Sequence, residues 1–432
     1  MLIKTRGWFF FIVMILLASN VKSATDQELR YENAIYESDI RTVVLLNEAG
    51  FNFPLVELNE SLNKLTLSFD QLSSERDFYQ YTLIHCDANW EKSPISRTQY
   101  LSGVGFESID NSFFSNGTLT QYTHYEVNLP SENTKPTISG NFLLLVYRNF
   151  DETDIVLSRR IMVLGSKGNV SLNVVQSNQV EFRQVQQQVN FVFNKTSGDY
   201  YIPNPQMDIK SVVLRNGEWN SAIDNLKPQF IKGNSYEYNQ MLGNQFDGIN
   251  EYRYFDIRSL QVAQAGVKKR MNIGGQKHVW LIADKSRGQD RYLTWRDYNG
   301  RVFYDNKDLP NQVNIESDYC FVHFTLVSPD LKQNIYLYGE LTDWSIKEDF
   351  KLFYNSDLSQ YEAIVPLKQG FYNYMYVIPE TEGVTIDYKT LEGSHSVTEN
   401  NYMVLIYHRN QSMPYDELIG YGLTNSVQGA NR

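Results

Sequence analysis

Apolar and polar residues alternate along much of this chain, and this period of two is the feature that most limits how it can fold. The alternation is clear at residues 65–69, 170–174, 189–193 and 335–338. It predicts half-buried antiparallel strands, because successive side chains of a strand point to opposite faces of a sheet. Helical periodicity is scarce and is confined to short stretches such as residues 26–36, which an extended segment would also fit. We therefore expect an all-β protein.

Polar segments divide the strand pattern into three consecutive antiparallel β-sandwich domains. One segment, 166–169, separates two alternating runs, and a second, 305–317, contains Pro310. Polar segments with turn residues between periodic runs are typical of linkers. The expected division is a signal peptide at 1–23, sandwiches at 24–166, 167–312 and 313–409, and a docked or free tail at 410–432.

Two Asn-Gly pairs, Asn216-Gly217 and Asn299-Gly300, lie between apolar or aromatic runs. Asparagine and glycine accept the positive φ angles that a tight turn requires. Both pairs predict two-residue hairpins.

The first residues have the pattern of an export signal. Lys4 and Arg6 precede the apolar run 8–18, which is too short for an ordinary transmembrane helix. Small residues before Ala24 suit cleavage near position 23, so we expect a soluble exported product. No cysteine that could carry a lipid anchor follows the apolar run directly.

The charge balance limits the class of partner. Residues 1–23 contain three basic residues and no acidic one, so their removal changes the formal charge from −11 to −14. An acidic surface repels nucleic acid and anionic lipid. A protein or a neutral ligand is the expected partner, and the isolated chain is expected to be a monomer.

Two cysteines in an exported chain could form a disulfide, but their positions argue against it. Cys86 lies in the first predicted domain and Cys320 in the third. A bridge would have to join two domains, so we expect two buried free thiols.

The triplet His85-Cys86-Asp87 is the strongest candidate for catalysis or metal binding. On a strand, His85 and Asp87 share one face while Cys86 faces away, so three ligands cannot converge. A structural histidine held by Asp87 or by a backbone carbonyl is the expectation. The sequence also lacks the usual hydrolase, phosphate-loop, metalloprotease and calcium motifs. We predict no catalytic residue, no metal site, no cofactor and no enzyme activity.

The segment 103–121 is a candidate partner contact. It combines glycine, serine and asparagine with Phe106, Phe113 and Phe114. An adaptable loop that carries apolar anchors is typical of interfaces. The alternative is that these phenylalanines cover the open end of the first sandwich.

A set of aromatic and polar motifs runs through the chain in a fixed order. The motifs are Phe69-Asp70-Gln71-Leu72, His85-Cys86-Asp87-Ala88-Asn89-Trp90, Tyr122-Thr123-His124-Tyr125, Ser139-Gly140-Asn141-Phe142, Asn250-Glu251-Tyr252-Arg253-Tyr254-Phe255-Asp256, Asp297-Tyr298-Asn299-Gly300 and Leu367-Lys368-Gln369-Gly370-Phe371-Tyr372-Asn373-Tyr374.

Taken together, these motifs resemble the type IX secretion system plug protein family. The resemblance implies a non-enzymatic protein in the periplasm, at the inner face of the outer membrane. Such a protein closes the inner mouth of the outer-membrane translocon barrel of that system when no cargo carrier occupies it. The implied partner is the barrel protein, through which the plug is peripheral to the membrane.

The last domain resembles a second family, the early-set immunoglobulin-like modules that bind starch or glycogen. The motif 338–345 includes Trp344, whose counterpart in sugar-binding members stacks on a glucan. A second tryptophan follows in those members, but residues 377–387 contain none. The alternative function is therefore a periplasmic carbohydrate-binding protein that uses Trp344. The competing expectation is that Trp344 packs within its own sandwich.

Overall fold

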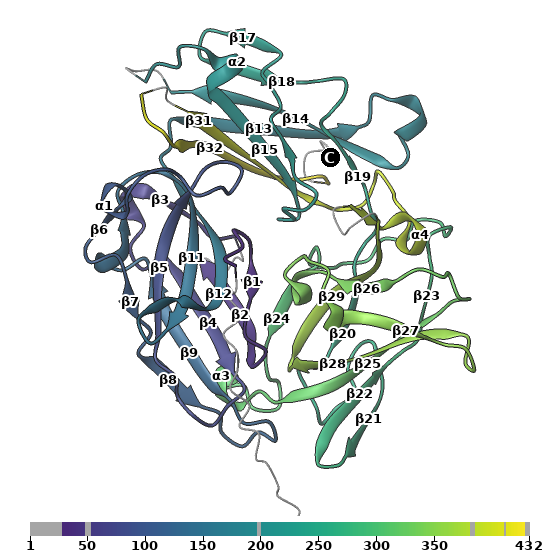
Figure 1. Ribbon diagram of the computed structural model, residues 1–432. Helices are drawn as coiled ribbons and strands as arrows, with labels where there is room; N and C mark the ends of the chain where they lie inside the picture. Colours follow the sequence, from purple (N-terminus) through teal and green to yellow (C-terminus); the bar gives the residue numbers. More distant parts are fainter. Residues whose placement is uncertain (1–27, 48–52, 197–199, 381–384, 410–411, 428–432) are drawn as a thin grey trace, which may run out of the picture.

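The computed structural model describes residues 28–47, 53–196, 200–380, 385–409 and 412–427, and the predicted signal peptide lies outside them. Three β-sheet units surround a common centre (Figure 1). Within the described ranges, no helix is long and apolar enough to cross a membrane. The expected all-β fold of several antiparallel sandwiches is confirmed.

The first unit covers residues 28–165 and consists of two packed sheets. One sheet contains β1 (Ala34–Ile35), β3 (Leu55–Glu57), β5 (Tyr79–Cys86), β7 (Glu107–Ser108), β11 (Gly140–Arg148) and β12 (Asp151–Leu164). The other contains β2 (Ile40–Asn47), β4 (Leu65–Gln71), β8 (Asn111–Phe114) and β9 (Thr123–Leu129). The orders are β1-β12-β11-β5-β7 and β2-β4-β9-β8, and β3 pairs with β12. A small pair, β6 (Leu101–Ser102) with β10 (Lys135–Pro136), and the helix α1 (Arg97–Tyr100) lie beside them.

Strands β5 and β11 are covered on both faces, which explains their nearly continuous apolar sequence. Phe142 and Leu144 face the core between the two sheets, where they meet Leu67. Leu143 and Leu145 face the other way, into an apolar cluster that also contains residues of the second unit. The sheet is therefore buried on both sides, as continuous apolar strands usually are.

The second unit is also a pair of packed sheets. Its strands are β13 (Gly168–Gln176), β14 (Gln186–Lys195), β15 (Ile209–Arg215), β16 (Ile223–Asp224), β17 (Phe230–Lys232), β18 (Ser235–Tyr238), β19 (Gln245–Asp247), β31 (Asn401–Arg409) and β32 (Asp416–Asn425), with the helix α2 (Pro205–Asp208). One sheet has the order β13-β14-β18-β17, with β19 beside β14, and the other has the order β16-β15-β31-β32. Val189, Phe191 and Phe193 of β14 pack on Val404 and Ile406 of β31.

The third unit covers residues 250–394 and is inserted between β19 and β31. Its strands are β20 (Arg253–Asp256), β21 (Val267–Ile273), β22 (Gln276–Leu281), β23 (Asp284–Lys285), β24 (Val302–Tyr304), β25 (Tyr319–Val327), β26 (Ile335–Tyr338), β27 (Lys351–Asn355), β28 (Gln360–Lys368), β29 (Gly370–Pro379) and β30 (Ile386–Asp387). Two one-turn helices, α3 (Val313–Glu316) and α4 (Lys389–Glu392), complete it. The main order is β20-β29-β26-β27-β28-β25-β22-β21, and residues from both ends of this sheet share one core.

These pairings correct the domain boundaries expected near residues 312 and 409. Strands β20 to β24, assigned by sequence to the second domain, pair within the third unit. Strand β31, assigned to the third domain, pairs with β15 of the second, and much of the expected tail forms β32. Local patterns reveal strands but not their distant partners, so an inserted unit looks like the next domain in line.

The two Asn-Gly turns have the expected backbone but not the expected hairpins. Asn216 and Gly217 have φ angles of 52° and 82°, and Asn299 and Gly300 have the same values. The first pair leads into a longer loop before β16, and the second precedes β24, which pairs with β29. The positive φ angles were predictable from residue type, whereas the loop lengths were not.

Both cysteines are buried free thiols, as the sequence predicted. Burial raises the pKa of each thiol to about 12. Neither sulfur is therefore a ready nucleophile at neutral pH.

Candidate functional site

Most of the ordered motifs meet at three buried junctions between the units. The first junction joins units one and two, the second joins units one and three, and the third joins units two and three. Each junction contains charged or aromatic side chains that are shielded from solvent.

The first junction contains two tryptophans and an arginine. Trp90, in a left-handed conformation with φ of 67°, meets Trp219 of the second unit edge to face, with ring centroids 5.1 Å apart. The guanidinium of Arg160 lies 4.6 Å from the ring centre of Trp90 and 5.0 Å from that of Trp219. Burial lowers the pKa of Arg160 to about 10. A cation over two indoles holds the units together through contacts that depend on geometry.

Hydrogen bonds beside the tryptophans also join the first unit to the second. The Asn141 amide donates to the carbonyl of Asp87 at 2.9 Å, and the Tyr407 hydroxyl donates to Asn141 Oδ1 at 2.8 Å. Asn141 and Tyr407 are fully buried. Asn141 of the Ser139–Phe142 motif thus connects the His85–Trp90 motif to β31.

A buried carboxylate of β32 completes the first junction. Asp416 accepts hydrogen bonds from the Ala88 amide at 2.9 Å and from Lys210 at 3.0 Å. Arg409 donates to its other oxygen at 2.5 Å. Burial alone would raise the pKa of Asp416, but the hydrogen bonds from Arg409 and Ala88 and the charge of Lys210 lower it. The loop of the first unit is therefore bound to an ionised group of the second.

His85 has a structural environment. Its Nε2 donates to the Ser139 carbonyl at 3.2 Å, and its Nδ1 accepts from the Ser93 hydroxyl at 2.8 Å. Burial lowers its pKa to about 4, so the ring is neutral at neutral pH. A Cβ at Gly140 would lie 2.4 Å from His85 Nε2, so only glycine fits there. In the part of the chain that the structure describes, no three histidine, cysteine or acidic side chains gather as metal ligands would.

The second junction is an ionic cluster around Asp70, which is fully buried. Asp70 Oδ1 lies 2.7 Å from His124 Nδ1, and its Oδ2 lies 2.6 Å from Lys368 Nζ. The Tyr319 hydroxyl also donates to Oδ2 at 2.7 Å. The side chains of His124 and Lys368 are 5% and 3% exposed. Three motifs, far apart in sequence, thus supply Asp70, His124 and Lys368 to one cluster.

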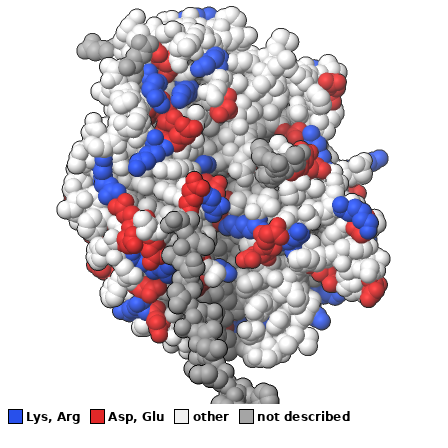
Figure 2. Space-filling model, viewed as in Figure 1, with Lys and Arg blue, Asp and Glu red and all other residues white. Residues whose placement is uncertain are grey.

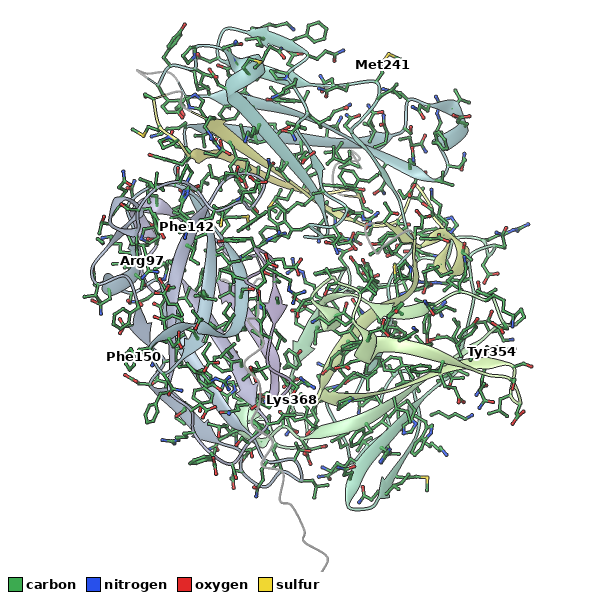
Figure 3. The ribbon with its side chains drawn as sticks, in the orientation of Figure 1. Arg97, Phe142, Phe150, Met241, Tyr354 and Lys368 are labelled. Atoms are coloured by element: carbon green, nitrogen blue, oxygen red, sulfur yellow. The ribbon has the colours of Figure 1, made fainter. Side chains whose placement is uncertain are left out.

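The charges in this cluster depend on one another. Burial alone would raise the pKa of Asp70, but Lys368 and His124 lower it. Burial lowers the pKa of Lys368, and the charge of Asp70 opposes that shift. Figure 3 shows Lys368 at the boundary between the first and third units. Loss of the charge of Asp70 or of Lys368 would leave the other group buried without its counterion.

Two further contacts extend the second junction. The Tyr122 hydroxyl donates to the Ser317 carbonyl at 2.8 Å, just after α3. Arg159 of β12 forms an ion pair of 3.1 Å with Asp343, which Lys347 also contacts at 2.6 Å. Arg159 thus joins β12 of the first unit to the third unit.

The third junction is centred on Glu218, which is fully buried. Arg215 donates to Glu218 at 2.6 Å, and the hydroxyls of Tyr252 and Tyr388 donate to it at 3.4 and 3.3 Å. The Arg215 guanidinium also lies 5.2 Å from the ring centre of Tyr388. The side chains of the second unit are thereby bound to aromatic residues of the third.

The motifs of the third unit hold its own strands in register. Glu392 accepts from Arg253 at 3.0 Å and from Arg287 at 2.5 Å. Asp297 accepts from the Tyr252 amide and from the Asn299 amide, and burial raises its pKa to about 7. Both acidic side chains therefore have hydrogen-bond donors of the protein itself as partners.

Residues 40–165 match the model of the first domain of type 9 secretion system plug proteins. The chain belongs to this plug protein family. The plug family consists of structural and not catalytic proteins, and membership implies association with a component of the secretion system.

A hypothetical protein from Parabacteroides merdae of known crystal structure is similar to most of this plug-family chain. The two share 30% identity with a TM-score of 0.87, over 92% of this chain and 100% of that one. The BSP domain of a biofilm associated protein (7% identity, 92% of this chain and 61% of that one) and Salmonella alpha-2-macroglobulin (9%, 91% and 33%) give TM-scores of only 0.17 and 0.16. No curated protein matches the chain.

The predicted contact residues of this plug-family protein lie along the edge of the first unit. Phe113 and Phe114 on the edge strand β8 are 51% and 48% exposed. Phe106 is half-buried and meets Phe150 edge to face at 5.9 Å. The end of the segment 103–121 is already bound inside the molecule, because Asp318 accepts from the amides of residues 119 and 120.

Trp344 lies in the third unit beside a cavity of about 370 Å³ that residues of all three units line. Its ring meets Tyr338 at 5.7 Å and Tyr252 at 6.0 Å, both edge to face. A Cβ at Gly300 would lie 2.2 Å from the indole. Trp219 lines the same cavity from the second unit, a neighbour that the sequence did not indicate.

Proposed function

We propose that the protein is a non-enzymatic periplasmic plug. It closes the inner mouth of the outer-membrane translocon barrel of the type 9 secretion system when cargo carrier is absent. The observation that carries the proposal is that the family motifs form buried junctions and so fix three β units as one body. A plug for a wide pore needs bulk and rigidity, and three units joined through buried hydrogen bonds and ion pairs supply both.

The mixed charges on the surface suit a reversible contact with the barrel. Figure 2 shows acidic and basic residues side by side on one face, with uncharged areas between them. Reversible interfaces are more polar than permanent ones. A plug that must leave the barrel when cargo carrier binds requires such a surface.

We propose the aromatic edge of the first unit as the contact with the barrel. Phe106, Phe113 and Phe114 are the central residues. Phe78 and Phe150, which are 74% and 65% exposed, belong to the same unit. Figure 3 places Phe150 on the outer side of this unit, away from the third. Exposed aromatic residues of this kind often supply most of the energy of an interface.

A deletion strain tests the role. Removal of the protein should leave cargo secretion largely intact and should let large, normally excluded antibiotics cross the outer membrane. A strain that lacks both plug and barrel should be no leakier than one that lacks the barrel alone. An outer membrane that stays impermeable in the plug deletion, with unchanged barrel complexes, would contradict the proposed closure.

Co-purification tests the contact. Tagged protein should co-purify with the barrel chiefly in cells without cargo carrier, because the two compete for one mouth. Phe113→Ala with Phe114→Ala should weaken this association by more than about 1 kcal/mol. The control is Phe230→Ala with Ile231→Ala in the second unit, where the side chains are 51% and 42% exposed. Equal loss in both variants would refute the proposed surface.

A further inference from the structure

Two histidines of the third unit lie together on the outer face of its sheet. His278 is on β22 and His323 on β25, and these strands run parallel, with His278 opposite Phe321 and Trp280 opposite His323. The two histidines are therefore diagonal neighbours, and His278 Nδ1 lies 2.9 Å from His323 Nε2. Figure 1 shows β22 beside β25 at the lower end of the third unit.

Stacked rings hold both imidazoles in place. Trp280 stacks on His323 with centroids 4.1 Å apart, and Phe321 stacks on His278 at 5.1 Å. The ammonium of Lys269, on β21, lies 4.2 Å from the ring centre of Trp280. Side chains that packing already orders lose little freedom when they bind a ligand. Both histidines are only partly buried, so an ion could reach them.

The distance between the two nitrogens suits a metal ion. Imidazole nitrogens bind divalent metals at about 2.0 to 2.1 Å, so nitrogens 2.9 Å apart subtend about 90° at one ion. An angle of about 90° belongs to square-planar or tetragonal sites, whereas a tetrahedral zinc site requires about 109°. Among such ions Cu²⁺ binds imidazole most tightly and Ni²⁺ follows.

We propose that His278 and His323 form a binding site for one divalent transition-metal ion, with Cu²⁺ preferred. Each nitrogen then donates its lone pair to the ion in place of the hydrogen bond between the rings. The proton that lay between them moves to the other nitrogen of its own ring, so no net proton is lost. Two protein ligands leave the remaining positions of the ion to water or to a ligand from a bound partner.

Titration of the full-length exported protein, without a histidine tag and after treatment with EDTA, tests the proposal. We expect calorimetry to give one Cu²⁺ per chain with micromolar affinity, and Ni²⁺ and Zn²⁺ to bind more weakly. Cu²⁺ should quench tryptophan fluorescence, because Trp280 stacks on His323. The electron paramagnetic resonance spectrum of the bound Cu²⁺ should show coupling to two nitrogens. Labelling the histidines with ¹⁵N should change that coupling.

Two substitutions and one control complete the test. His278→Gln and His323→Gln should each weaken Cu²⁺ binding by at least about tenfold. The control is His395→Gln: His395 contacts Tyr292, away from the histidine pair, and this variant should bind Cu²⁺ as the unchanged protein does. Circular dichroism of the metal-free variants checks that they fold. Millimolar affinity, zinc bound as tightly as copper, unchanged binding in His323→Gln, or no effect of the ¹⁵N label would each overturn the proposal.

Discussion

The buried ion pair between Lys368 and Asp70 allows a quantitative test of the second junction. Lys368→Met removes the ammonium and leaves the Asp70 carboxylate buried, with Tyr319 and His124 still 2.7 Å away. Removal of one partner of a buried pair costs about 3 to 5 kcal/mol. Because two contacts to Asp70 remain, we expect the lower value, about 3 kcal/mol.

A double-mutant cycle measures the interaction energy between Asp70 and Lys368 apart from their contacts with other residues. Asp70→Asn alone should also destabilise, since it leaves the Lys368 ammonium buried without a counterion. The double variant should lose about 1 to 3 kcal/mol less than the two single losses added together. Lys332→Met is the matched control, because its pair with Asp330 is also short, at 2.5 Å, but Lys332 is 84% exposed. The control should leave stability unchanged.

Equilibrium unfolding in urea measures these changes. Two probes are needed, tryptophan fluorescence and circular dichroism, because three units need not unfold together. Hydrogen exchange in β4 and β28, the strands that carry Asp70 and Lys368, should locate the loss. A cost below about 1 kcal/mol for Lys368→Met, or single losses that simply add, would refute the view that this pair fastens the junction.

Three further predictions concern other parts of the structure. Because the pKa of His85 falls from 6.5 to about 4 on folding, its contribution to stability is present above pH 6.5. That contribution is lost as the pH falls to about 4, by about 3 kcal/mol, and His85→Gln should flatten this part of the stability profile measured in urea. Gly300→Ala should lower the melting temperature in calorimetry, because φ is 82° and the new methyl would meet Trp344. Arg160→Met should loosen the first junction, seen as faster limited proteolysis between units one and two, whereas Trp219→Phe should do so less.

The sequence predicted the strands far better than their arrangement. Residues 65–69 were expected to form a strand and lie within β4, because alternation is a local property. By contrast, Asp70 and Lys368 are 298 residues apart, and no local pattern indicates their ion pair. The motif that contains His85 could be interpreted as a structural signature, but its partners on β31 and β32 could not be predicted. The pair of His278 and His323 was missed for the same reason, since β22 and β25 meet only in the folded sheet.

The insertion of the third unit into the second means that the chain crosses between them twice. The two crossings lie side by side, since a Cβ at Gly248 would be 2.0 Å from the carbonyl oxygen of His395. One protease cut at either crossing would leave the unit tethered by the other. The second sandwich also cannot close during synthesis until β31 has been made, about 150 residues after β19. The order of synthesis therefore favours completion of the inserted unit before the sandwich that hosts it.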